Sequence, residues 1–417
     1  MNVPEGLSER LARRIWGYRE EMVAFQCRLT AIQAMAPEGG GEGEWERSRY
    51  LLERLREFGV SDVSEFNAPD ARVPGGLRPN LVARVGGRRA HPAVWVMAHM
   101  DTVPPGELSH WETDPFEALV KDGKVFGRGT EDNQQGLTGA VFALRALVDE
   151  GLTPTTDAAV LLVADEENGN TFGIHYLLSA APDLVGPDDL VVVPDFGLPD
   201  GAGLEVAEKS ILWASFVVHG RQVHASVPGD GINAHRAAAN LTVRLDQRLH
   251  ARFAALDPLF DPSGSTFEPT KREANVPNVN TVPGEDRFYF DCRVLPRYPP
   301  ADVKAEIESV TAEIEVEFGV TVEVSYPHQA AAAPASPADA PVVLALADAV
   351  RQVRGVEPYP MGMGGGTVAA VLRRRGIPAV AWGTMHGLAH QPNECCAIDD
   401  MVADCLVFAH LFMRADV

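Results

Sequence analysis

The segment AVWVMAHMD, residues 93–101, is a short apolar run that ends in polar side chains. Its length and its β-branched and aromatic residues are typical of a buried strand. Because side chains alternate along a strand, His99 and Asp101 are expected to share one face at the strand end, where one can bind a metal ion and the other can orient it. For this pair alone, a purely structural hydrogen bond is an equally good interpretation.

Apolar runs alternate with helical patterns on both sides of this segment. The strand patterns include NLVARVGG (80–87), AAVLLVADEE (158–167) and DLVVVPDFG (189–197), and the helical patterns include QGLTGAVFALRALVDEG (135–151) and GIHYLLSAA (173–181). This alternation predicts an α/β fold with a mainly parallel sheet and helices on both of its faces.

The pattern changes from about Lys209 onward. Strand and helix patterns there follow the order β-α-β-β-α-β, which predicts a small α+β domain with one sheet and two helices. After the Ala/Pro-rich hinge HQAAAAPASPADAP (328–341), the α/β rhythm resumes. We therefore expect a discontinuous first domain, residues 1–207 and 328–417, that encloses an inserted domain, residues 208–327.

The composition is that of an acidic globular protein. Lys and Arg number 36 and Asp and Glu 58, which gives a net charge of −22. Such a charge disfavours nucleic acid and anionic membranes as partners and favours a small molecule or a cation. Five cysteines without a CxxC spacing indicate neither a disulfide framework nor a cysteine zinc site. The charged N-terminus, and the lack of an apolar run near ~20 residues, predict a cytoplasmic protein that does not enter a membrane.

Acidic residues stand where other strands or turns are expected to end, namely Asp132, Glu166, Glu167 and Asp195. The carboxyl ends of the strands form the ligand crevice of an open α/β sheet, so these side chains are expected to meet there. Because bunched carboxylates repel one another unless a cation is present, the pattern predicts a metal site.

A second imidazole for this cluster can come from His390. His386 would compete with it if HGLAH (386–390) were helical, but Gly387 and Pro392 favour a loop and therefore His390. Two histidines with several carboxylates suit zinc, and cobalt or manganese also fit such a donor set.

Five segments together carry a resemblance to a known family: HMDTVP (99–104), GRGTED (127–132), DEE (165–167), VPD (193–195) and AHQPNE (389–394). In order and spacing they resemble the dinuclear zinc hydrolases that include acetylornithine deacetylase, succinyl-diaminopimelate desuccinylase, aminoacylase and glutamate carboxypeptidase. The resemblance spans almost the whole chain, and it implies a zinc-exopeptidase-like catalytic domain with an inserted lid and dimerisation domain.

Carried onto this sequence, the resemblance implies two divalent cations that share one carboxylate. The bridging ligand would be Asp132, with His99 and Asp195 on one ion and Glu167 and His390 on the other. Glu166 would be the general base, and Asp101 would accept the free ring N–H of His99. The implied reaction is hydrolysis of an amide bond, peptide or N-acyl, in a small amino-acid-derived substrate, by a water held between the two cations.

The inserted domain would add residues that contact the substrate. His224 resembles a family histidine that reaches the active site of a neighbouring copy and stabilises the oxyanion, which implies a homodimer; an ordinary helix-start histidine is the alternative. Asn280 and Arg293 resemble positions that contact a substrate carbonyl or carboxylate, although either can be a structural partner within the insert.

The glycine segment GMGGGTVAA (362–370) lacks a clear preceding strand and does not match the spaced dinucleotide fingerprint. We interpret Gly364, Gly365 and Gly366 as positions where the backbone closely approaches the substrate, with nucleotide binding as the weaker hypothesis.

Two departures from the family pattern bear on specificity. Val368 stands where members often carry Asp, and Asn133-Gln134-Gln135 replace the usual Lys-Gly. These changes leave the choice among dipeptidase, carboxypeptidase and N-acyl-amino-acid deacylase open. A non-catalytic metal-dependent binding protein on the same fold is the alternative to an enzyme, and it would have no need of Glu166.

Overall fold

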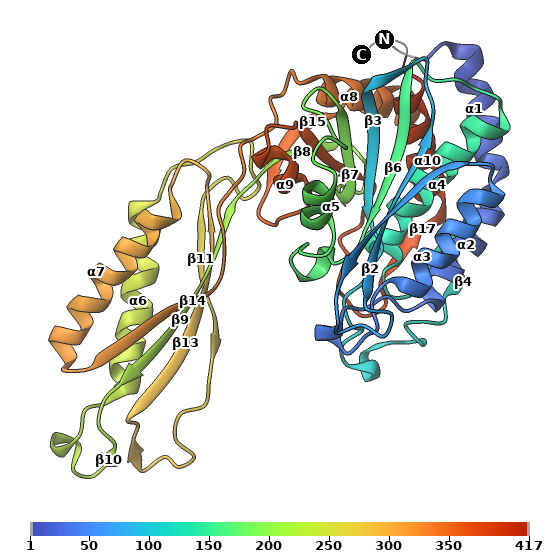
Figure 1. The fold of residues 1–417 in the computed structure, drawn as a ribbon. Coiled ribbons are helices and arrows are strands. Elements are labelled where there is room, and N and C mark those ends of the chain that lie inside the picture. The colour runs from blue at the N-terminus through green and yellow to red at the C-terminus, as the bar shows by residue number, and fades with distance from the viewer. Residues whose placement is uncertain (1–2, 415–417) are drawn as a thin grey trace. The chain divides into compact units, whose positions relative to one another are not determined.

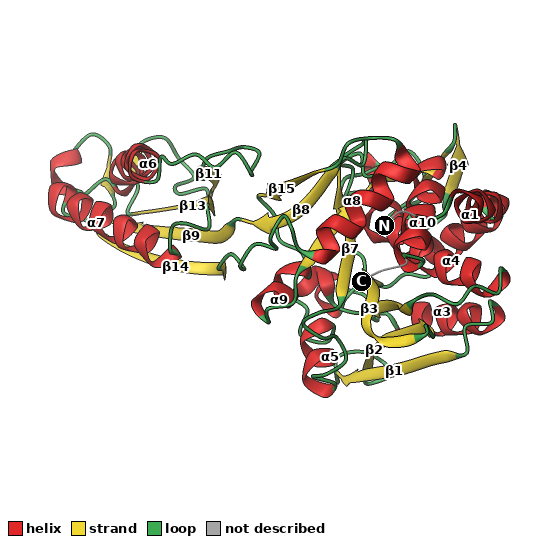
Figure 2. Ribbon diagram, turned by 90° about the horizontal axis from the view of Figure 1, so that it is seen from above, coloured by secondary structure: helices red, strands yellow, loops and turns green. Residues whose placement is uncertain are grey.

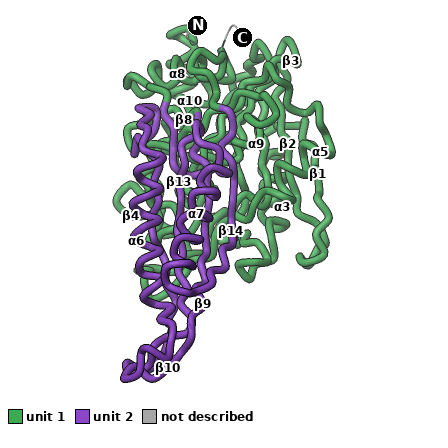
Figure 3. Tube along the Cα trace, turned by 90° about the vertical axis from the view of Figure 1, so that its left-hand side faces the viewer, with its two compact units in different colours: residues 1–206, 335–360, 367–417 green, residues 207–334, 361–366 purple. Residues whose placement is uncertain are grey.

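A computed structural model of the chain describes residues 3–414 and divides into two compact units (Figure 3). Unit 1 consists of Met1–Val206, Ala335–Pro360 and Thr367–Val417, and unit 2 consists of Ala207–Pro334 and Met361–Gly366. The inserted unit therefore extends beyond residue 327, because its last strand continues to Ala330. It also takes in the first part of the glycine segment, up to Gly366, where the Met363 carbonyl accepts a hydrogen bond of 3.0 Å from the Lys209 amide.

The main sheet has eight strands in the order β1-β2-β6-β3-β7-β16-β8-β15 (Figure 1). The central strands β6, β3, β7 and β16 are parallel to their neighbours in that group, whereas β1, β2 and β8 pair antiparallel. The predicted α/β class is confirmed, with antiparallel strands at the margins of the sheet. The bounds are β1 Asp62–Pro69, β2 Leu77–Val85, β3 Arg89–His99, β6 Thr156–Val163, β7 Leu190–Gly197, β8 Gly203–Glu208, β15 Tyr359–Met363 and β16 Ala379–Gly383.

Helices cover both faces of this sheet (Figure 2). Helices α5 (Ile174–Ala180) and α9 (Ala369–Arg374) contribute to a buried cluster on one face, together with apolar side chains of β3, β6 and β7. The helices of the opposite layer include α4, α8 and α10, and α4 is buried along most of its length. The bounds are α1 Glu5–Gly17, α2 Arg19–Ala31, α3 Trp45–Glu57, α4 Gln135–Asp149, α8 Pro341–Arg354 and α10 Ile398–Phe412. A small sheet joins β4 Leu119–Lys121, β5 Lys124–Phe126 and β17 Cys395–Ala397.

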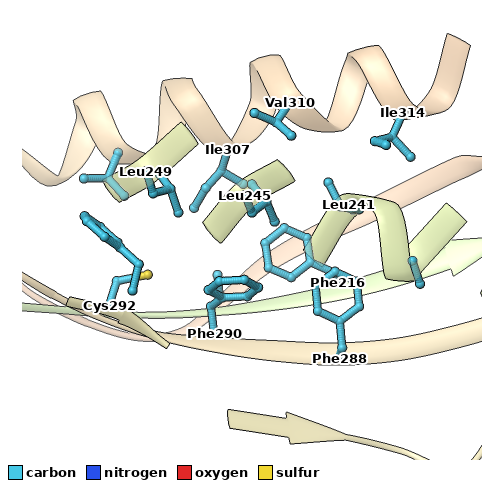
Figure 4. Close-up of a cluster of buried hydrophobic side chains, with 14 of the residues drawn as sticks. Phe216, Leu241, Leu245, Leu249, Phe288, Phe290, Cys292, Ile307, Val310 and Ile314 are labelled. Carbon is cyan, nitrogen blue, oxygen red and sulfur yellow. The ribbon is translucent and has the colours of Figure 1, made fainter. Parts of the chain in front are cut away.

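Unit 2 is a four-stranded antiparallel sheet in the order β11-β13-β9-β14 with two long helices. The alternating burial along β13 sends Phe288, Phe290 and Cys292 into the core with side chains of α6 and α7 (Figure 4). Arg293 therefore lies on the other face of the sheet. The bounds are β9 Ser210–His219, β10 Val223–His224, α6 Ala234–Arg252, β11 Thr266–Arg272, β12 Thr281–Val282, β13 Glu285–Val294, α7 Pro300–Phe318 and β14 Thr321–Ala330.

Local sequence signals explain where the helices α7 and α8 begin and end. Both begin with a proline, at Pro300 and Pro341, where the missing N–H removes no helical hydrogen bond. Both are followed by a glycine in the left-handed region, Gly319 at φ 65° and Gly355 at φ 68°, which favours glycine because it lacks a Cβ. Within residues 3–414, no helix has the length and apolar character needed to cross a membrane.

Candidate metal centre

Four of the predicted site residues of unit 1 lie at or just beyond the carboxyl ends of adjacent parallel strands, whereas Asp132 lies in the segment Thr130–Gln134 before α4 and His390 lies in a loop. His99 ends β3, Glu166 and Glu167 follow β6, and Asp195 lies near the end of β7. The strand order β6-β3-β7 makes these three strands neighbours. Residues that are far apart in sequence therefore meet at one edge of the sheet, where open α/β sheets bind their ligands.

One group of potential ligand atoms surrounds the imidazole of His99. Its Nε2 lies 2.9 Å from Asp132 Oδ1 and 3.3 Å from Asp195 Oδ1. The His99 side chain is only 2% exposed, so these contacts are shielded from solvent. The three residues offer atoms that all lie within 4.8 Å of one another, which is a spacing that one cation can span.

A second group shares Asp132 with the first. His390 Nε2 lies 3.2 Å from Asp132 Oδ2 and 3.1 Å from Glu167 Oε2. Asp132 thus directs one carboxylate oxygen toward each histidine, as a ligand that bridges two cations would. His386 points elsewhere, because its Nε2 lies 3.0 Å from Asp400 Oδ2 on α10.

The electrostatics of the cluster are those of closely spaced carboxylates that require positive charge. Burial and the neighbouring Asp132 raise the pKa of Glu167 to about 7. Burial would lower the pKa of His99, but hydrogen bonds to Asp101, Asp132 and Asp195 raise it well above its ordinary value. Hydrogen bonds to Asp132 and Glu167 raise the pKa of His390 to about 10.

The donor set fits divalent cations. Imidazole nitrogens and carboxylate oxygens are the ligands that zinc and related ions take in proteins. Glu167 Oε1 is buried and has no hydrogen-bond partner in the described part of the chain, so one oxygen of this carboxylate is free to bind an ion. A buried polar atom of this kind is costly unless a partner satisfies it.

Glu166 lies beside this cluster on the turn that follows β6. The preceding residue, Asp165, adopts a left-handed conformation with φ 61°, which is uncommon for a residue with a side chain. Burial and the negative charge of Asp195 raise the pKa of Glu166 well above its usual range. A carboxyl group with a raised pKa suits proton transfer near neutral pH.

Asp101 lies just beyond the end of β3 and contacts more than His99. Its carboxylate accepts hydrogen bonds from the backbone amides of Glu166 at 3.1 Å and Glu167 at 3.0 Å. His99 Nδ1 lies 3.1 Å from the main-chain oxygen of Asp101 and 3.4 Å from its Oδ1. The side chain therefore connects the His99 strand end to the turn that carries Glu166 and Glu167.

Glu394 is a buried acid near the cluster that the sequence analysis did not single out. It is 1% exposed, and its carboxylate accepts hydrogen bonds from the amides of Gly129, Glu131 and Asp132 at 2.9–3.0 Å. Arg128 Nη1 also donates to it at 2.7 Å. The signal available was the position of Glu394 at the end of AHQPNE, directly before the apolar residues Cys395 and Cys396.

Two buried arginines contact segments next to the strand ends. Arg78 and Glu44 are both fully buried and form an ion pair, and Arg78 Nη2 also lies 3.4 Å from Asp165 Oδ1. Arg47 is buried as well, and its guanidinium donates to the carbonyls of Met100, Leu29 and Ile32. Neither arginine stands in a motif that the spacing of the sequence could reveal.

The remaining predicted site residues belong to unit 2, whereas the cluster belongs to unit 1. His224 on β10 is exposed, and its Nδ1 lies 2.7 Å from Ser226 Oγ. It lies near Asn280, because the Asn280 carbonyl accepts a hydrogen bond of 2.8 Å from the amide of Ala225. His224 therefore lies in the small β10–β12 ladder of this unit, and Asn280 directly precedes strand β12.

The guanidinium of Arg293 is engaged within unit 2. It donates to both oxygens of Asp291, at 2.6 and 3.0 Å, and to the carbonyl of Gly364 at 2.8 Å. The glycine segment that holds Gly364, Gly365 and Gly366 follows strand β15 and precedes the short helix α9. The expectation that no strand precedes the glycine segment is therefore wrong, although the spacing of its glycines still differs from the dinucleotide fingerprint.

The chain is similar to known proteins over most of its length. Residues 95–414 match the sequence model of peptidase family M20/M25/M40. The chain is 36% identical to an uncharacterized metallohydrolase of Methanococcus maripaludis over 92% of this chain and 96% of that protein. It is 27% identical to the succinyl-diaminopimelate desuccinylase of Cereibacter sphaeroides over 89% and 93% of the two chains.

The fold is shared with solved structures. Human carnosine dipeptidase 1 superposes with a TM-score of 0.76 at 17% identity, over 99% of both chains. A tripeptidase of Staphylococcus aureus superposes with a TM-score of 0.74 at 20% identity, over 95% of this chain and 98% of that chain. At these identities the likeness concerns the fold alone.

Proposed function

This chain belongs to peptidase family M20/M25/M40 and is a metallohydrolase of amide bonds, and from this premise we propose its substrate class and its cofactors. The protein hydrolyses a peptide or N-acyl bond in a small amino-acid-derived substrate. It uses two divalent cations, and zinc is the first choice for both. A dipeptide, a peptide with a free carboxyl terminus and an N-acyl amino acid all fit this proposal. Because the family and its named relatives are hydrolases, a catalytic role is favoured over that of a binding protein.

The observation that carries the proposal is the geometry of Asp132. Its two carboxylate oxygens contact the imidazoles of two different groups, His99 with Asp195 and His390 with Glu167. A single cation would need only one of these groups. Two cations held by both groups would offset the charge of the three carboxylates Asp132, Asp195 and Glu167.

The cations supply Lewis-acid chemistry: they polarise the carbonyl of the substrate and lower the pKa of water at the site. The residues proposed to hold them are His99, Asp132, Asp195, Glu167 and His390. Glu166 is proposed to take the proton from the attacking water and to donate it to the leaving amine, which is the usual work of a positioned carboxylate. Asp101 would hold the turn of Glu166 in place through the backbone amide that it binds.

Unit 2 is proposed to complete the site. His224 would donate a hydrogen bond to the developing oxyanion in a second copy of the chain, so that the active protein would be a homodimer in the cytoplasm. Asn280 and the backbone of Gly364, Gly365 and Gly366 would contact the substrate. Arg293 would bind a substrate carboxylate if it exchanged Asp291 for the ligand.

The first test is metal analysis of the purified protein, followed by assay of the metal-loaded protein on dipeptides, N-acyl amino acids and succinylated diamino acids. We expect two divalent ions per chain and one preferred substrate class, whose hydrolysis stops when a chelator removes the metal. A metal-replete protein that hydrolyses no member of the panel would contradict the proposal.

The role of Glu166 is tested by Glu166→Gln, which keeps the size of the side chain and removes its ability to accept a proton. We expect two bound ions and a turnover lowered by about 10²–10⁴, the usual contribution of a positioned general base. Glu53→Gln is the matched control, because Glu53 is exposed on α3. Near-wild-type turnover of metal-replete Glu166→Gln would assign the proton transfer to another group.

A further inference from the structure

His390 stands on a loop whose own hydrogen bonds join Gln391 to the carbonyls of Gly387 and Leu388. Its side chain is 54% exposed, whereas the other histidine of the cluster, His99, is 2% exposed. The residue adopts a left-handed conformation with φ 65°, which a histidine rarely takes. From outside the loop, Arg128 Nη2 donates to the His390 carbonyl at 3.3 Å.

The side chain of Glu131, which directly precedes Asp132, contacts this loop. Its carboxylate accepts hydrogen bonds from the backbone amides of His386 and Leu388, both at 2.5 Å. Glu131 is 1% exposed, so these charge-assisted bonds are shielded from water. One acidic side chain thus binds two of the amides that precede His390 in the loop.

Glu394, at the other end of the same loop, makes the reverse connection. Its carboxylate accepts hydrogen bonds from the amides of Glu131 at 2.9 Å and Asp132 at 3.0 Å. We call Glu131 and Glu394 the crossed clamp: each residue lies in one segment, and its carboxylate binds the backbone of the other. Two segments that carry ligands from opposite parts of the sequence are therefore joined twice.

The crossed clamp explains which histidine faces the metal centre. With the amides of His386 and Leu388 bound to Glu131, the His386 imidazole turns to Asp400 on α10. The imidazole of His390 instead contacts Asp132 and Glu167.

We propose that the crossed clamp is a positioning device that fixes His390 relative to Asp132 and so sets the affinity for one of the two cations. This inference rests on the proposed function, because it takes Asp132, Glu167 and His390 as metal ligands. It predicts an unequal effect on the two ions, since His99 and Asp195 do not depend on the loop for their positions. A general loss of stability would lower the affinity for both ions together.

The test is a titration of the metal-free full-length protein with cobalt(II), followed by calorimetry and by the visible absorption of the bound ion. In Glu131→Gln, the amide side chain has one acceptor oxygen, so one of the two loop amides loses its partner. We expect one of the two ions to bind about 10- to 100-fold more weakly, the usual effect of removing a group that orients a ligand, while the affinity for the other changes little. Glu53→Gln is expected to match the wild-type protein at both ions.

A double-mutant cycle separates positioning from a general effect. If Glu131 acts through His390, then adding Glu131→Gln to His390→Ala weakens binding no further, within about twofold. The inference is overturned if Glu131→Gln binds both ions as the wild-type protein does. It is also overturned if the affinity for both ions falls equally, or if the effects of the two substitutions are additive in the double variant. Far-UV circular dichroism checks folding, and Glu131→Asp, whose shorter side chain withdraws the carboxylate from the loop amides, replaces Glu131→Gln if the latter does not fold, with the same expected result.

The outcomes also separate this inference from the proposed function. If the wild-type protein binds fewer than two cobalt ions, the two-cation function fails and the inference fails with it. If the wild-type protein binds two ions and Glu131→Gln leaves both affinities unchanged, only the inference fails.

Discussion

Asp101→Asn tests whether the Asp101 carboxylate holds the turn that carries Glu166 and Glu167 in place. In the structure the Asp101 carboxylate accepts the amides of both Glu166 and Glu167, at 3.1 and 3.0 Å. Asparagine has nearly the same shape but only one acceptor oxygen, so its amide group must face one of these two N–H donors. The substitution therefore removes one charge-assisted hydrogen bond and leaves a backbone donor without a partner.

The structure sets the expected size of the effect. A hydrogen bond to a charged group contributes about 1.5–3 kcal/mol, and Asp101 is 1% exposed, so water does not replace the lost bond. We expect the free energy of unfolding of the metal-free protein to fall by about this amount. Because Glu167 is a proposed ligand on the same turn, we expect metal affinity to fall about 10- to 100-fold.

The assay is a cobalt titration of Asp101→Asn, with turnover measured at a metal concentration that saturates the variant. Turnover is expected to stay below wild type at saturation, because the same turn also carries Glu166. Asp62→Asn is the matched control, since Asp62 is exposed on β1. If Asp101→Asn binds metal and turns over substrate as the wild-type protein does, the amide contacts of Asp101 do not organise the site.

Two further predictions concern stability. Arg78→Met breaks the buried ion pair with Glu44 and the contact with Asp165, so we expect a loss of about 3–5 kcal/mol in urea unfolding; a loss below about 1 kcal/mol would contradict an essential pair. Burial lowers the pKa of His410 from 6.5 to about 4, so its neutral form favours the folded state. This contribution is complete above pH 6.5 and is lost as the pH falls toward 4, by about 3 kcal/mol in total. His410→Gln should therefore unfold with a weaker dependence on pH in this range, and an unchanged dependence would refute the assignment.

The strand ends of the candidate site could be predicted because two local signals coincide there. An apolar run marks a buried strand, and a polar residue directly after it marks the strand end, as in AVWVMAHMD and AAVLLVADEE. Parallel strand ends lie at one edge of the sheet, so the proximity of these residues follows from fold class alone. The predicted fold class was therefore sufficient to predict that acids distant in sequence would lie close together.

The supporting residues could not be predicted, because their partners come from remote segments. Arg47 lies in the charged helix α3, where periodicity alone marks an arginine as exposed. Its carbonyl partners Leu29, Ile32 and Met100 become available only once α2 and β3 have packed. Strand β15 was missed for a related reason: its sequence YPMGM has weak strand propensity, and pairing with β8 makes it a strand.

The acids near the cluster fall into two kinds that composition cannot distinguish. Asp101, Glu131 and Glu394 each accept two or more backbone N–H groups, so their oxygens are occupied and they hold chain segments in place. Asp132 contacts imidazoles instead, and Glu167 keeps one buried oxygen that has no hydrogen-bond partner among residues 3–414. Because a buried carboxylate is stabilised by the donors around it, the first kind is satisfied by backbone amides, whereas the second kind keeps oxygens that a cation could bind. Which of these acids keep oxygens for other partners is thus decided by where the backbone amides point, and this depends on the tertiary fold.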